Sequence, residues 1–435
     1  MYRVPPTKKG DYVVDSSVRT IKAYALDGCD KLTSIKMDNN LERIEIYAFK
    51  NCKNAKPITL GKSVKYIGQC AFDSCNTITH LTLPNSVEVF KGYLNCEKLV
   101  AFWVGSKVKE LHDGIGKGCP NLNTITVMDD NPYYSDRYGI LYTKAQDSLV
   151  CCPRGKEGDF NIPETVKCIR GYALGFSEGL TSINIPESVT LIKSGAILGC
   201  HKLQKVTIGK NVKEMLGVTF EDCPVLKEIV VDANNQNYKS VDGVLFKKDG
   251  SKLYREPSAM AKTSYIVPSE VQTIVGYAFE GCSLLTNLTI GANVDLIGWN
   301  AFKDNMKEGE IHMLNPEPVV IRDGAFSPVT EQNVTLYVPN AKAVEAYKNA
   351  EYWKNFVDIR AEGEGSVAAV ATEAIKAFAV GKTIRIVGAK ADALVEIYNI
   401  SGQMIARYVA DSFNVAQRGI YIVRVEGKTF KVAVK

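Results

Sequence analysis

The sequence predicts an elongated solenoid of short repeats followed by a small all-β domain. One 23-residue pattern, clearest in VKYIGQCAFDSCNTITHLTLPNS at residues 64–86, recurs along most of the 435-residue chain. Within each copy, apolar and polar residues alternate over a short stretch, which is typical of a half-buried strand. Near residue 372 the 23-residue period gives way to short alternating runs, and this change predicts the second domain.

The repeat is marked by an apolar pair followed by Pro, Gly or a small polar residue. The second member of the pair falls at eleven positions, Met37, Leu60, Leu83, Val104, Val127, Ile185, Ile208, Val231, Ile290, Met313 and Val338. Successive spacings are 23, 23, 21, 23, 58, 23, 23, 59, 23 and 25 residues, so the two long ones equal one repeat plus an insertion. Such a fixed spacing indicates a repeat architecture, and we expect about eleven 23-residue units.

Each unit fits a leucine-rich repeat template. In the first unit Leu32, Ile35, Met37 and Leu41 are the apolar residues and Asn40 takes the asparagine place. The first half predicts a short strand of a parallel sheet. The second half carries an Ala-Phe pair with Cys three residues beyond Phe, which favours a short helical or 3₁₀ turn.

Repeats of the form V-x-x-I-x-x-x-A-F-x-x-C-x-x-L-T-x-I-x-I-P resemble the BspA-type leucine-rich repeats of bacterial surface proteins over about residues 11–361. The departures are Gly92-Tyr93 and Ile115-Gly116 in place of Ala-Phe, and Ser177, Asn305 and Val329 in place of Cys. The resemblance implies a bacterial protein that adheres to host proteins or to partner cells.

Eight of the twelve cysteines share one position of the repeat: Cys29, Cys52, Cys75, Cys96, Cys119, Cys200, Cys223 and Cys282. Neighbouring copies of this position lie about 5 Å apart, within reach of a disulfide. Because Ser, Asn and Val also occur there, we expect a column of reduced, packed thiols. A linear column cannot supply tetrahedral zinc ligands, so no metal is expected. Cys151 and Cys152 lie outside the column and would be the pair to react first, but an ordinary loop position is the favoured interpretation.

The chain in order predicts four further features of the repeat region. Residues 1–17 hold no full repeat and are expected to cap a repeat domain at 18–361. Insertions near 128–163 and 232–268 align with each other at an offset of 104 residues, and each predicts a β-hairpin. After the last unit, apolar residues at helical spacing predict an amphipathic capping helix near 340–356.

The insertions begin with Asx-rich runs that invite comparison with calcium loops. Asp129, Asp130 and Asn131 open the first insertion, and Asp232, Asn234 and Asn235 stand in the second. A calcium loop needs alternating ligands, a Gly and a closing Glu, and neither series is complete. The pattern therefore favours Asx turns at the strand ends.

Beyond the repeats, residues 362–371 read EGEGSVAAVA and predict a linker. Residues 372–435 predict a small immunoglobulin-like β-sandwich, because short alternating runs are separated by Gly or Ser-Gly. This region is similar to the C-terminal sorting domain of the Por, or type IX, secretion system, on the residues Tyr398, Gly402, Gly419, Ile420, Tyr421 and the closing stretch 431–435. That resemblance implies export across an outer membrane, and in an organism without this machinery the domain would be an accessory module.

Composition argues against several classes of function. The net charge is only +5 and no Lys/Arg run is interleaved with aromatics, so no nucleic-acid partner is expected. No stretch of 18 apolar residues occurs, so no transmembrane segment is expected. The start MYRVPPTKKG lacks the apolar region of a signal peptide. If the protein is exported, we expect that this chain begins after signal-peptide cleavage or has been trimmed.

No catalytic motif is present. The four histidines stand in four different units, and no H-E-x-x-H, G-x-S-x-G or phosphate-loop pattern occurs. The sequence therefore predicts no enzyme, no catalytic residue and no cofactor.

The outward face of the repeat sheet is the first candidate for ligand contact. Trp103 stands in register with Thr82 and Thr126, and close to His80. An exposed indole offers a broad contact surface with one hydrogen-bond donor, so we expect this patch to bind ligand. The alternative is that the first insertion covers the indole.

The tyrosine-rich first insertion is the second candidate, with Tyr133 and Tyr138 as contact residues, because loops often carry function. Taken together, the sequence predicts a monomeric, non-enzymatic adhesion protein, secreted or on the outer cell surface, whose partner is a host extracellular-matrix protein or a protein of a partner cell. A carbohydrate-binding surface protein that captures glycans and a structural envelope protein are the alternatives.

Overall fold

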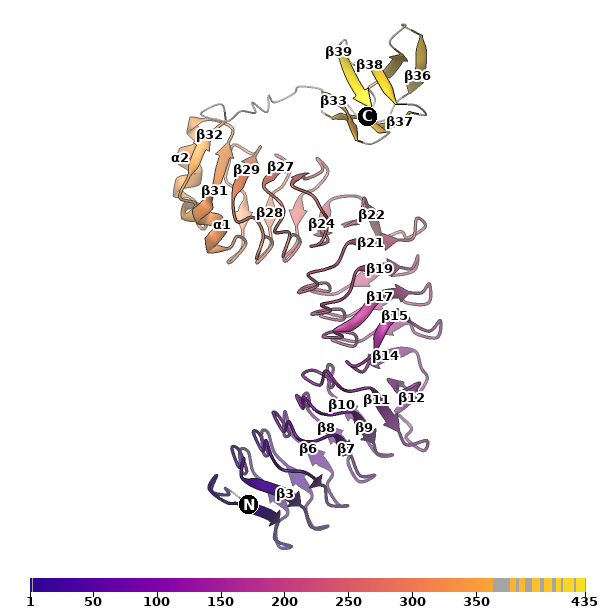
Figure 1. Cartoon of the computed structure of the whole chain (residues 1–435), viewed down its shortest axis with the longest axis vertical. Helices are drawn as coiled ribbons and strands as arrows, with labels where there is room; N and C mark the ends of the chain where they lie inside the picture. The colour runs from indigo at the N-terminus through magenta and orange to yellow at the C-terminus, as the bar shows by residue number, and fades with distance from the viewer. Residues whose placement is uncertain are drawn as a thin grey trace. The chain divides into compact units, whose positions relative to one another are not determined.

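The computed structural model describes residues 1, 3–362, 376–380, 383–387, 393–399, 403–408, 412–415, 418–425 and 428–434. The chain divides into two compact units, Met1–Ala361 and Glu362–Lys435 (Figure 1). The first is a β-solenoid with few helices, and the second is an all-β unit. In the described part of the chain, none of the helices has both the length and the apolar character needed to cross a bilayer.

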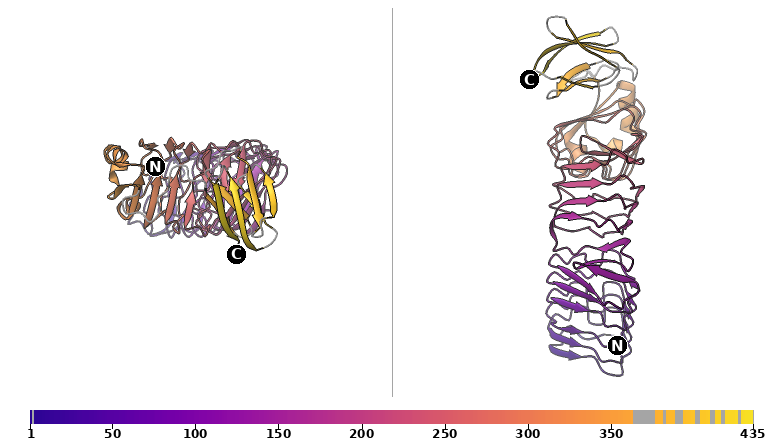
Figure 2. Two further views of the ribbon diagram at one scale, coloured as in Figure 1. Left: turned by 90° about the horizontal axis from the view of Figure 1, so that it is seen from above. Right: turned by 90° about the vertical axis from the view of Figure 1, so that its right-hand side faces the viewer.

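On one face of the solenoid each rung, meaning one turn of the solenoid, contributes a strand, and these strands form four successive parallel sheets; Figure 2 shows the strands stacked above one another. Within residues 3–362 this face has fifteen strands: β1 (Gly10–Val13), β3 (Leu32–Lys36), β5 (Ile58–Thr59), β7 (His80–Thr82), β9 (Ala101–Val104), β11 (Thr124–Val127), β15 (Glu157–Asn161), β17 (Gly179–Ile185), β19 (Lys205–Ile208), β21 (Glu228–Val231), β25 (Ser264–Ile266), β27 (Asn287–Ile290), β29 (Gly309–Met313), β31 (Val334–Val338) and β32 (Ile359–Ala361). We call it the long-strand face.

A second parallel ladder, which we call the short-strand face, runs along the solenoid with shorter strands. It consists of β2 (Thr20–Ile21), β4 (Arg43–Ile44), β6 (Tyr66–Ile67), β8 (Val89–Phe90), β10 (Glu110–Leu111), β14 (Ser148–Cys151), β16 (Cys168–Ile169), β18 (Leu191–Ile192), β20 (Glu214–Met215), β24 (Lys252–Arg255), β26 (Thr273–Ile274), β28 (Leu296–Ile297) and β30 (Val320–Ile321). Both ladders bury one side, so the core lies between them.

The structure has more rungs than the eleven units expected from the sequence. All eleven predicted strands form, but β1, β15, β25 and β32 are further strands of the long-strand face. Val14, Ile162 and Val267 follow the first three of these strands, and Ala361 ends β32. Each of these four residues stands 23 residues from one of the eleven apolar positions that define the repeat. These rungs lack an Ala-Phe turn at one end, and counting only complete units therefore missed them.

The turn halves of the units are not helical, contrary to the prediction of short helices or 3₁₀ segments. The exception within residues 3–362 is α1 (Pro328–Asn333), in the last unit. Each turn bends at a residue with positive φ shortly after the short strand: Tyr24, Tyr47, Cys70, Gly92, Gly114, Tyr172, Gly195, Gly217, Tyr277, Asn300 and Gly324. Most of these turns hold a second left-handed residue three to five positions later, such as Asn51 after Tyr47, so helical geometry is broken twice and isolated i→i+3 hydrogen bonds such as Cys52 N to the Phe49 carbonyl remain.

The cysteine column is buried, as predicted, and it also does something the sequence did not indicate. The Cys75 thiol donates to the Phe49 carbonyl of the preceding rung across 3.1 Å, and Cys29, Cys52, Cys96, Cys200, Cys223 and Cys282 make the same kind of bond. Where Cys is replaced, Asn305 Nδ2 donates to the Phe279 carbonyl across 2.7 Å. At these eight positions a small buried donor satisfies a carbonyl at the solenoid's corner, whereas the Ser177 hydroxyl at the same repeat position is buried without a partner.

Each insertion begins with an antiparallel hairpin, β12 (Tyr134–Arg137) with β13 (Ile140–Thr143), and β22 (Tyr238–Val241) with β23 (Val244–Lys247). The hairpin strand next to β14 or β24 is buried on both sides and separates two cores. In the first insertion Leu141 packs into the core that precedes it, whereas Ile140 and Tyr142 pack into the core that follows. In the second, Leu245 and Phe246 divide in the same way. The solenoid, Met1–Ala361, therefore has three core clusters instead of one.

The Asx runs at the starts of the insertions form structural turns, as the incomplete calcium pattern predicts. Asn131 is fully buried; its Nδ2 donates to the carbonyls of Gly105 and Val108, and its Oδ1 accepts from the backbone N–H groups of Tyr133 and Tyr134. Asn235 makes the same four bonds in the second insertion.

The C-terminal end of the repeat unit holds α2 (Ala341–Asn349), a 3₁₀ turn η1 (Trp353–Asn355) and then β32. Asn340 caps α2 by accepting from Ala343 N, and Tyr352, with φ of 64°, separates the two helical segments. Trp353 is buried and donates its indole N–H to the Val319 carbonyl. The aromatic residues of this segment therefore belong to the core.

The second unit contains two antiparallel sheets, one of β33 (Lys376–Val380), β34 (Thr383–Val387) and β37 (Ser412–Asn414), the other of β35 (Val395–Asn399), β36 (Met404–Tyr408), β38 (Gly419–Val425) and β39 (Lys428–Val434). Ile384 and Ile386 from the first sheet share a core with Val395 and Val423 from the second. Most of the expected linker, together with Gly402 and Lys435 of the sorting-domain motif, lies outside the described residues.

The buried amide of Asn131 allows a direct test of the insertion's anchoring. Replacing Asn131 with Ala leaves two carbonyls and two N–H groups without partners, and we expect it to lower the free energy of unfolding by about 3 kcal/mol. Urea denaturation followed by circular dichroism measures this loss. Asn121→Ala, which removes an exposed amide bound only to the Glu97 carbonyl, is the control and should cost less than about 1 kcal/mol. Equal losses would contradict the anchoring role.

Candidate binding surface and junctions of the solenoid

The predicted contact residues of the long-strand face lie together. Thr82 pairs with Trp103, and Trp103 pairs with Thr126, across β7, β9 and β11. Because alternate side chains of a strand point to the same side, all three face outward while Leu81, Phe102 and Ile125 fill the core. The structure thus forms a short outward row with the indole at its centre.

His80 stacks on Trp103. Their ring centroids are 5.6 Å apart and the planes are inclined by 22°. His80 pairs in register with Ala101, two residues before Trp103, so the imidazole reaches the indole diagonally. Ala101 is only 4% exposed although it stands on the outward side. A small residue there leaves room for the two rings, and His80 packs against the indole.

A groove of about 480 Å³ runs beside Trp103, where the strands leave the sheet. Its lining residues are Lys62, Thr82, Leu83, Pro84, Asn85, Ser86, Trp103, Val104 and Met128. A Cβ at Gly105 would lie 2.6 Å from the Pro84 carbonyl oxygen, so glycine is required where the two strand exits approach each other. Its lining combines the indole of Trp103 and apolar residues such as Pro84 and Met128 with residues that carry hydroxyl, amide and ammonium groups.

The two predicted tyrosines of the first insertion lie apart from this lining. Tyr138 is 80% exposed at the hairpin turn, where Lys156 Nζ donates to its carbonyl, and Tyr133 is 49% exposed. Tyr134 and Tyr142 are buried, so half of the tyrosine cluster belongs to the core. Met128, at the start of the insertion, is the residue that connects this segment to the groove.

The outward row is not equally open along the solenoid. In the last rungs Thr289, His312 and Tyr337 occupy the same register but are 8%, 2% and 2% exposed. His312 stacks on Tyr337 at a centroid distance of 5.0 Å, and its Nε2 lies 3.3 Å from a Glu310 carboxylate oxygen. The His312–Tyr337 pair is therefore buried, whereas the His80–Trp103 pair on β7 and β9 is partly exposed to solvent.

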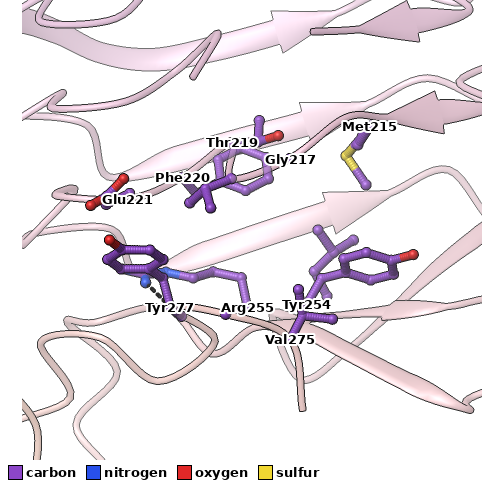
Figure 3. Close-up of a pocket in the computed structure, with 12 residues that line it drawn as sticks. Met215, Gly217, Thr219, Phe220, Glu221, Tyr254, Arg255, Val275 and Tyr277 are labelled. Atoms are coloured by element: carbon purple, nitrogen blue, oxygen red, sulfur yellow. Dashed lines mark hydrogen bonds between the residues drawn. The ribbon is translucent and has the colours of Figure 1, made fainter. Parts of the chain in front are cut away.

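A second pocket lies at the second insertion, between the turn at Met215–Glu221 and the turn at Val275–Tyr277 (Figure 3). Its volume is about 20 Å³, enough for roughly one water molecule. Arg255 lies along it, 2% exposed, and donates to the Tyr277 carbonyl and, across 2.6 Å, to Ser258 Oγ. Its Nε and the nearby Thr219 Oγ1 are buried without a hydrogen-bond partner.

Buried arginines occur at both insertions, and sequence reasoning missed both. Arg154 is 2% exposed and donates to the carbonyls of Cys152, Tyr172 and Ala173. The aligned insertions place these arginines at different sequence positions, yet both reach the carbonyl of the left-handed tyrosine in the following turn. The signal available in the sequence was an Arg within two residues of a Pro in each insertion, which did not stand out among the charged residues.

The burial of Cys151 and Cys152 speaks against the reactive alternative. Cys151 ends β14 and Cys152 follows it; both are fully buried, and because neighbouring residues of a strand alternate, their side chains enter different cores. Burial raises the pKa of both thiols, that of Cys152 to about 12. Within the described residues, no group of three or more His, Cys, Asp or Glu side chains is placed to hold a metal ion.

Comparison with protein families agrees with this geometry. The profile described as BspA type leucine rich repeat region matches six copies, over residues 19–137, 156–249 and 258–347, which is more than half of the chain. The chain belongs to the BspA-type leucine-rich repeat family. The matching profile describes a repeat region and indicates no catalytic family. No curated protein matches this BspA-type chain.

A solved leucine-rich repeat structure shows the same fold. A leucine-rich repeat protein from Eubacterium ventriosum is 24% identical, with a TM-score of 0.55, and the match covers 67% of this chain and 75% of that one. Two others are a leucine rich cell surface protein from Faecalibacterium prausnitzii, 18% identical with a TM-score of 0.42 over 80% and 82% of the two chains, and the pneumococcal vaccine antigen PcpA, 21% identical with a TM-score of 0.46 over 81% and 80%.

The burial of Cys151 and Cys152 can be tested by their accessibility to a thiol reagent. In the native protein at neutral pH we expect Cys151 and Cys152 to resist a thiol reagent, because both are buried and their pKa values are raised. Cys168, which is partly exposed, should react first. Mass mapping of alkylated peptides before and after addition of urea measures this order. Rapid native labelling at Cys151 or Cys152 would contradict the arrangement.

Proposed function

We propose that this chain is a non-enzymatic adhesion protein of the bacterial surface or exterior, which binds a partner protein through the groove beside Trp103. The carrying observation is the partly open His80–Trp103 pair on a rigid sheet, with a groove of about 480 Å³ at its side. Indole rings in preformed apolar pockets are frequent hot spots of protein interfaces. An aliphatic or aromatic side chain of the partner fits such a groove.

The rim chemistry supports a polypeptide partner. Thr82 and Asn85 offer hydroxyl and amide groups that bind peptide backbone, and Lys62 is the one ionisable side chain in the lining. Met128 is 44% exposed and adds a deformable apolar contact. The proposed partner is a protein of the host extracellular matrix or of another cell's surface, as the family resemblance implies, and the chain acts as a monomer.

Glycan capture is the second candidate function. Sugars stack their C–H faces on indole rings, and hydroxyl and amide groups at the rim bind their hydroxyls, so the same row of Thr82, Trp103 and Thr126 suits a neutral glycan. The Tyr133 and Tyr138 hairpin is a further contact surface in either case, because both rings are exposed. A purely structural envelope protein would show no soluble ligand.

We also propose a domain division that serves this role. It comprises a cap at 1–17, a repeat domain at 18–361, a linker at 362–371 and an immunoglobulin-like sandwich at 372–435 that acts as a Por-type sorting domain. The antiparallel sheets with a common core in the second unit support the last assignment. Mass analysis of the exported protein, showing the loss of residues after 371, would test it.

The groove hypothesis predicts a specific loss of binding in Trp103→Ala. The intact chain is screened against arrays of extracellular-matrix proteins and of glycans, and the affinity of each hit is measured by surface plasmon resonance. Removing a hot-spot indole costs about 2 kcal/mol or more, so we expect at least ~30-fold weaker binding.

Trp299→Ala is the matched control, since Trp299 is 50% exposed but packs against Tyr277, far along the sequence from the groove. It should bind like the parent. Equal affinity of parent and Trp103→Ala for every hit would refute the groove, and loss in Tyr138→Ala alone would move the site to the hairpin. Hits confined to glycans would favour glycan capture, and no hit on either array would favour a structural role.

A further inference from the structure

The outward side of the four-stranded sheet in the second unit combines apolar and cationic side chains. In this sheet β36, β35, β38 and β39 lie side by side in that order (Figure 1). Val395, Ile397 and Val423 are buried in the core that this sheet shares with the other one. Because alternate side chains of a strand point to opposite sides, the residues between them face outward. We call this side the outer face of the second unit.

An apolar row crosses the outer face. Met404 pairs with Tyr398, Tyr398 with Ile422, and Ile422 with Lys431, so one residue of each strand stands in line. The register shift after Ile397 leaves Ile405 as an extra residue next to Met404. Four large apolar side chains in and beside this sheet are 37–46% exposed: Leu394, Met404, Ile405 and Ile420. A patch of this kind on a water-exposed sheet is typical of an interaction surface.

Charged side chains form the neighbouring row. Glu396 pairs with Arg407 on one side and with Arg424 on the other, so two guanidinium groups flank one carboxylate. Glu396 Oε1 lies 3.5 Å from Arg407 Nε, and Glu396 Oε2 accepts from the Tyr398 hydroxyl across 2.9 Å. The Arg424 guanidinium lies over the Tyr398 ring, 5.2 Å from its centroid. Together with Lys431, the two rows carry three cations and one carboxylate.

The net charge of the chain is concentrated in this unit. Residues 372–435 contain ten Lys and Arg but only five Asp and Glu, which accounts for the whole net charge of +5. Residues 1–371 therefore hold equal numbers of cationic and anionic side chains. Net attraction to an anionic surface thus acts on the second unit and not on the solenoid.

An anionic lipid bilayer fits both rows of the outer face. Side chains such as Met404 and Ile405 can enter the boundary between head groups and acyl chains, while Arg and Lys keep their charged ends at the lipid phosphates. An acidic protein would have to match the apolar row and the charged row with its own side chains in one register. Lipid molecules move laterally and meet both rows without such a match.

We propose that the outer face of the second unit docks on an anionic lipid surface. Arg407, Arg424 and Lys431 bind the lipid phosphates, and the exposed apolar side chains beside them enter the interface. Each basic residue next to an anionic membrane strengthens binding about 5-fold, so the three together contribute roughly 100-fold. The docking applies to the chain that retains residues 372–435, and it needs no ligand in the groove beside Trp103.

Co-sedimentation of the full chain with lipid vesicles tests the docking. One set of vesicles contains phosphatidylcholine alone, and the other contains phosphatidylcholine and phosphatidylglycerol in a ratio of about 7 to 3. We expect the chain to bind the mixed vesicles and to bind phosphatidylcholine alone much more weakly. Binding to the mixed vesicles should weaken as the salt concentration rises, because salt screens the attraction between the cations and the phosphates.

Two variants separate the cationic from the apolar contribution. The triple variant Arg407→Gln, Arg424→Gln and Lys431→Gln should bind the mixed vesicles roughly 100-fold more weakly than the parent, because it lacks all three cations of the two rows. The double variant Met404→Ser and Ile405→Ser should also bind more weakly, but its binding should keep the salt dependence of the parent. Circular dichroism confirms that each variant is folded.

The matched control removes three exposed lysines of the solenoid, Lys53→Gln, Lys202→Gln and Lys213→Gln, and should bind like the parent. Equal losses in the two triple variants would overturn the docking face, as would equal binding of the parent to both kinds of vesicle. Absence of binding to the mixed vesicles would also overturn it, and retention of the chain on immobilised polyglutamate would then identify an acidic protein as the occupant.

Discussion

Each rung of this solenoid depends on its neighbour for both apolar burial and backbone pairing. The parallel ladders pair most strand groups, and the corner carbonyls are satisfied by a thiol such as Cys75 or an amide such as Asn305 from the next rung. Where an insertion removes the regular neighbouring rung, the guanidinium of Arg154 or Arg255 donates hydrogen bonds to the carbonyls that the rung would otherwise satisfy. The rule that buried polar groups need partners therefore explains the repeat and its interruptions alike.

The same stacking positions the candidate binding surface. Register brings Thr82, Trp103 and Thr126 into one row without any loop to fold, and Ala101 lets His80 lie against the indole. Fixed strands lower the entropic cost of holding an aromatic contact residue in place. The row differs from other rungs because Trp103 stands where neighbouring strands carry Thr, with His80 stacked beside it. Such outward positions can change without altering the buried residues that maintain the fold.

Much of this architecture could be predicted from the sequence, because the 23-residue period and the alternating strands are local signals. The four extra rungs escaped because they lack a full turn half, although Ile162 and Val267 carry the expected spacing. The turns at Tyr47 or Tyr277 could not be recognised as left-handed, since tyrosine rarely adopts positive φ and repetition alone forces it there. The burial of Cys151 and of Arg255 arises from contacts between segments far apart in sequence, which no local pattern encodes.

The partition of the core by the two hairpins has a mechanical consequence. Leu141 and Leu245 pack into the core before them, while Tyr142 and Phe246 pack into the core after them, so each hairpin is a wall between independent blocks. When a tethered chain is pulled along its length, a block can come apart without exposing the apolar interior of the next. The chain would then lengthen in steps under shear flow, keeping the rungs around Trp103 folded while another block takes up the load.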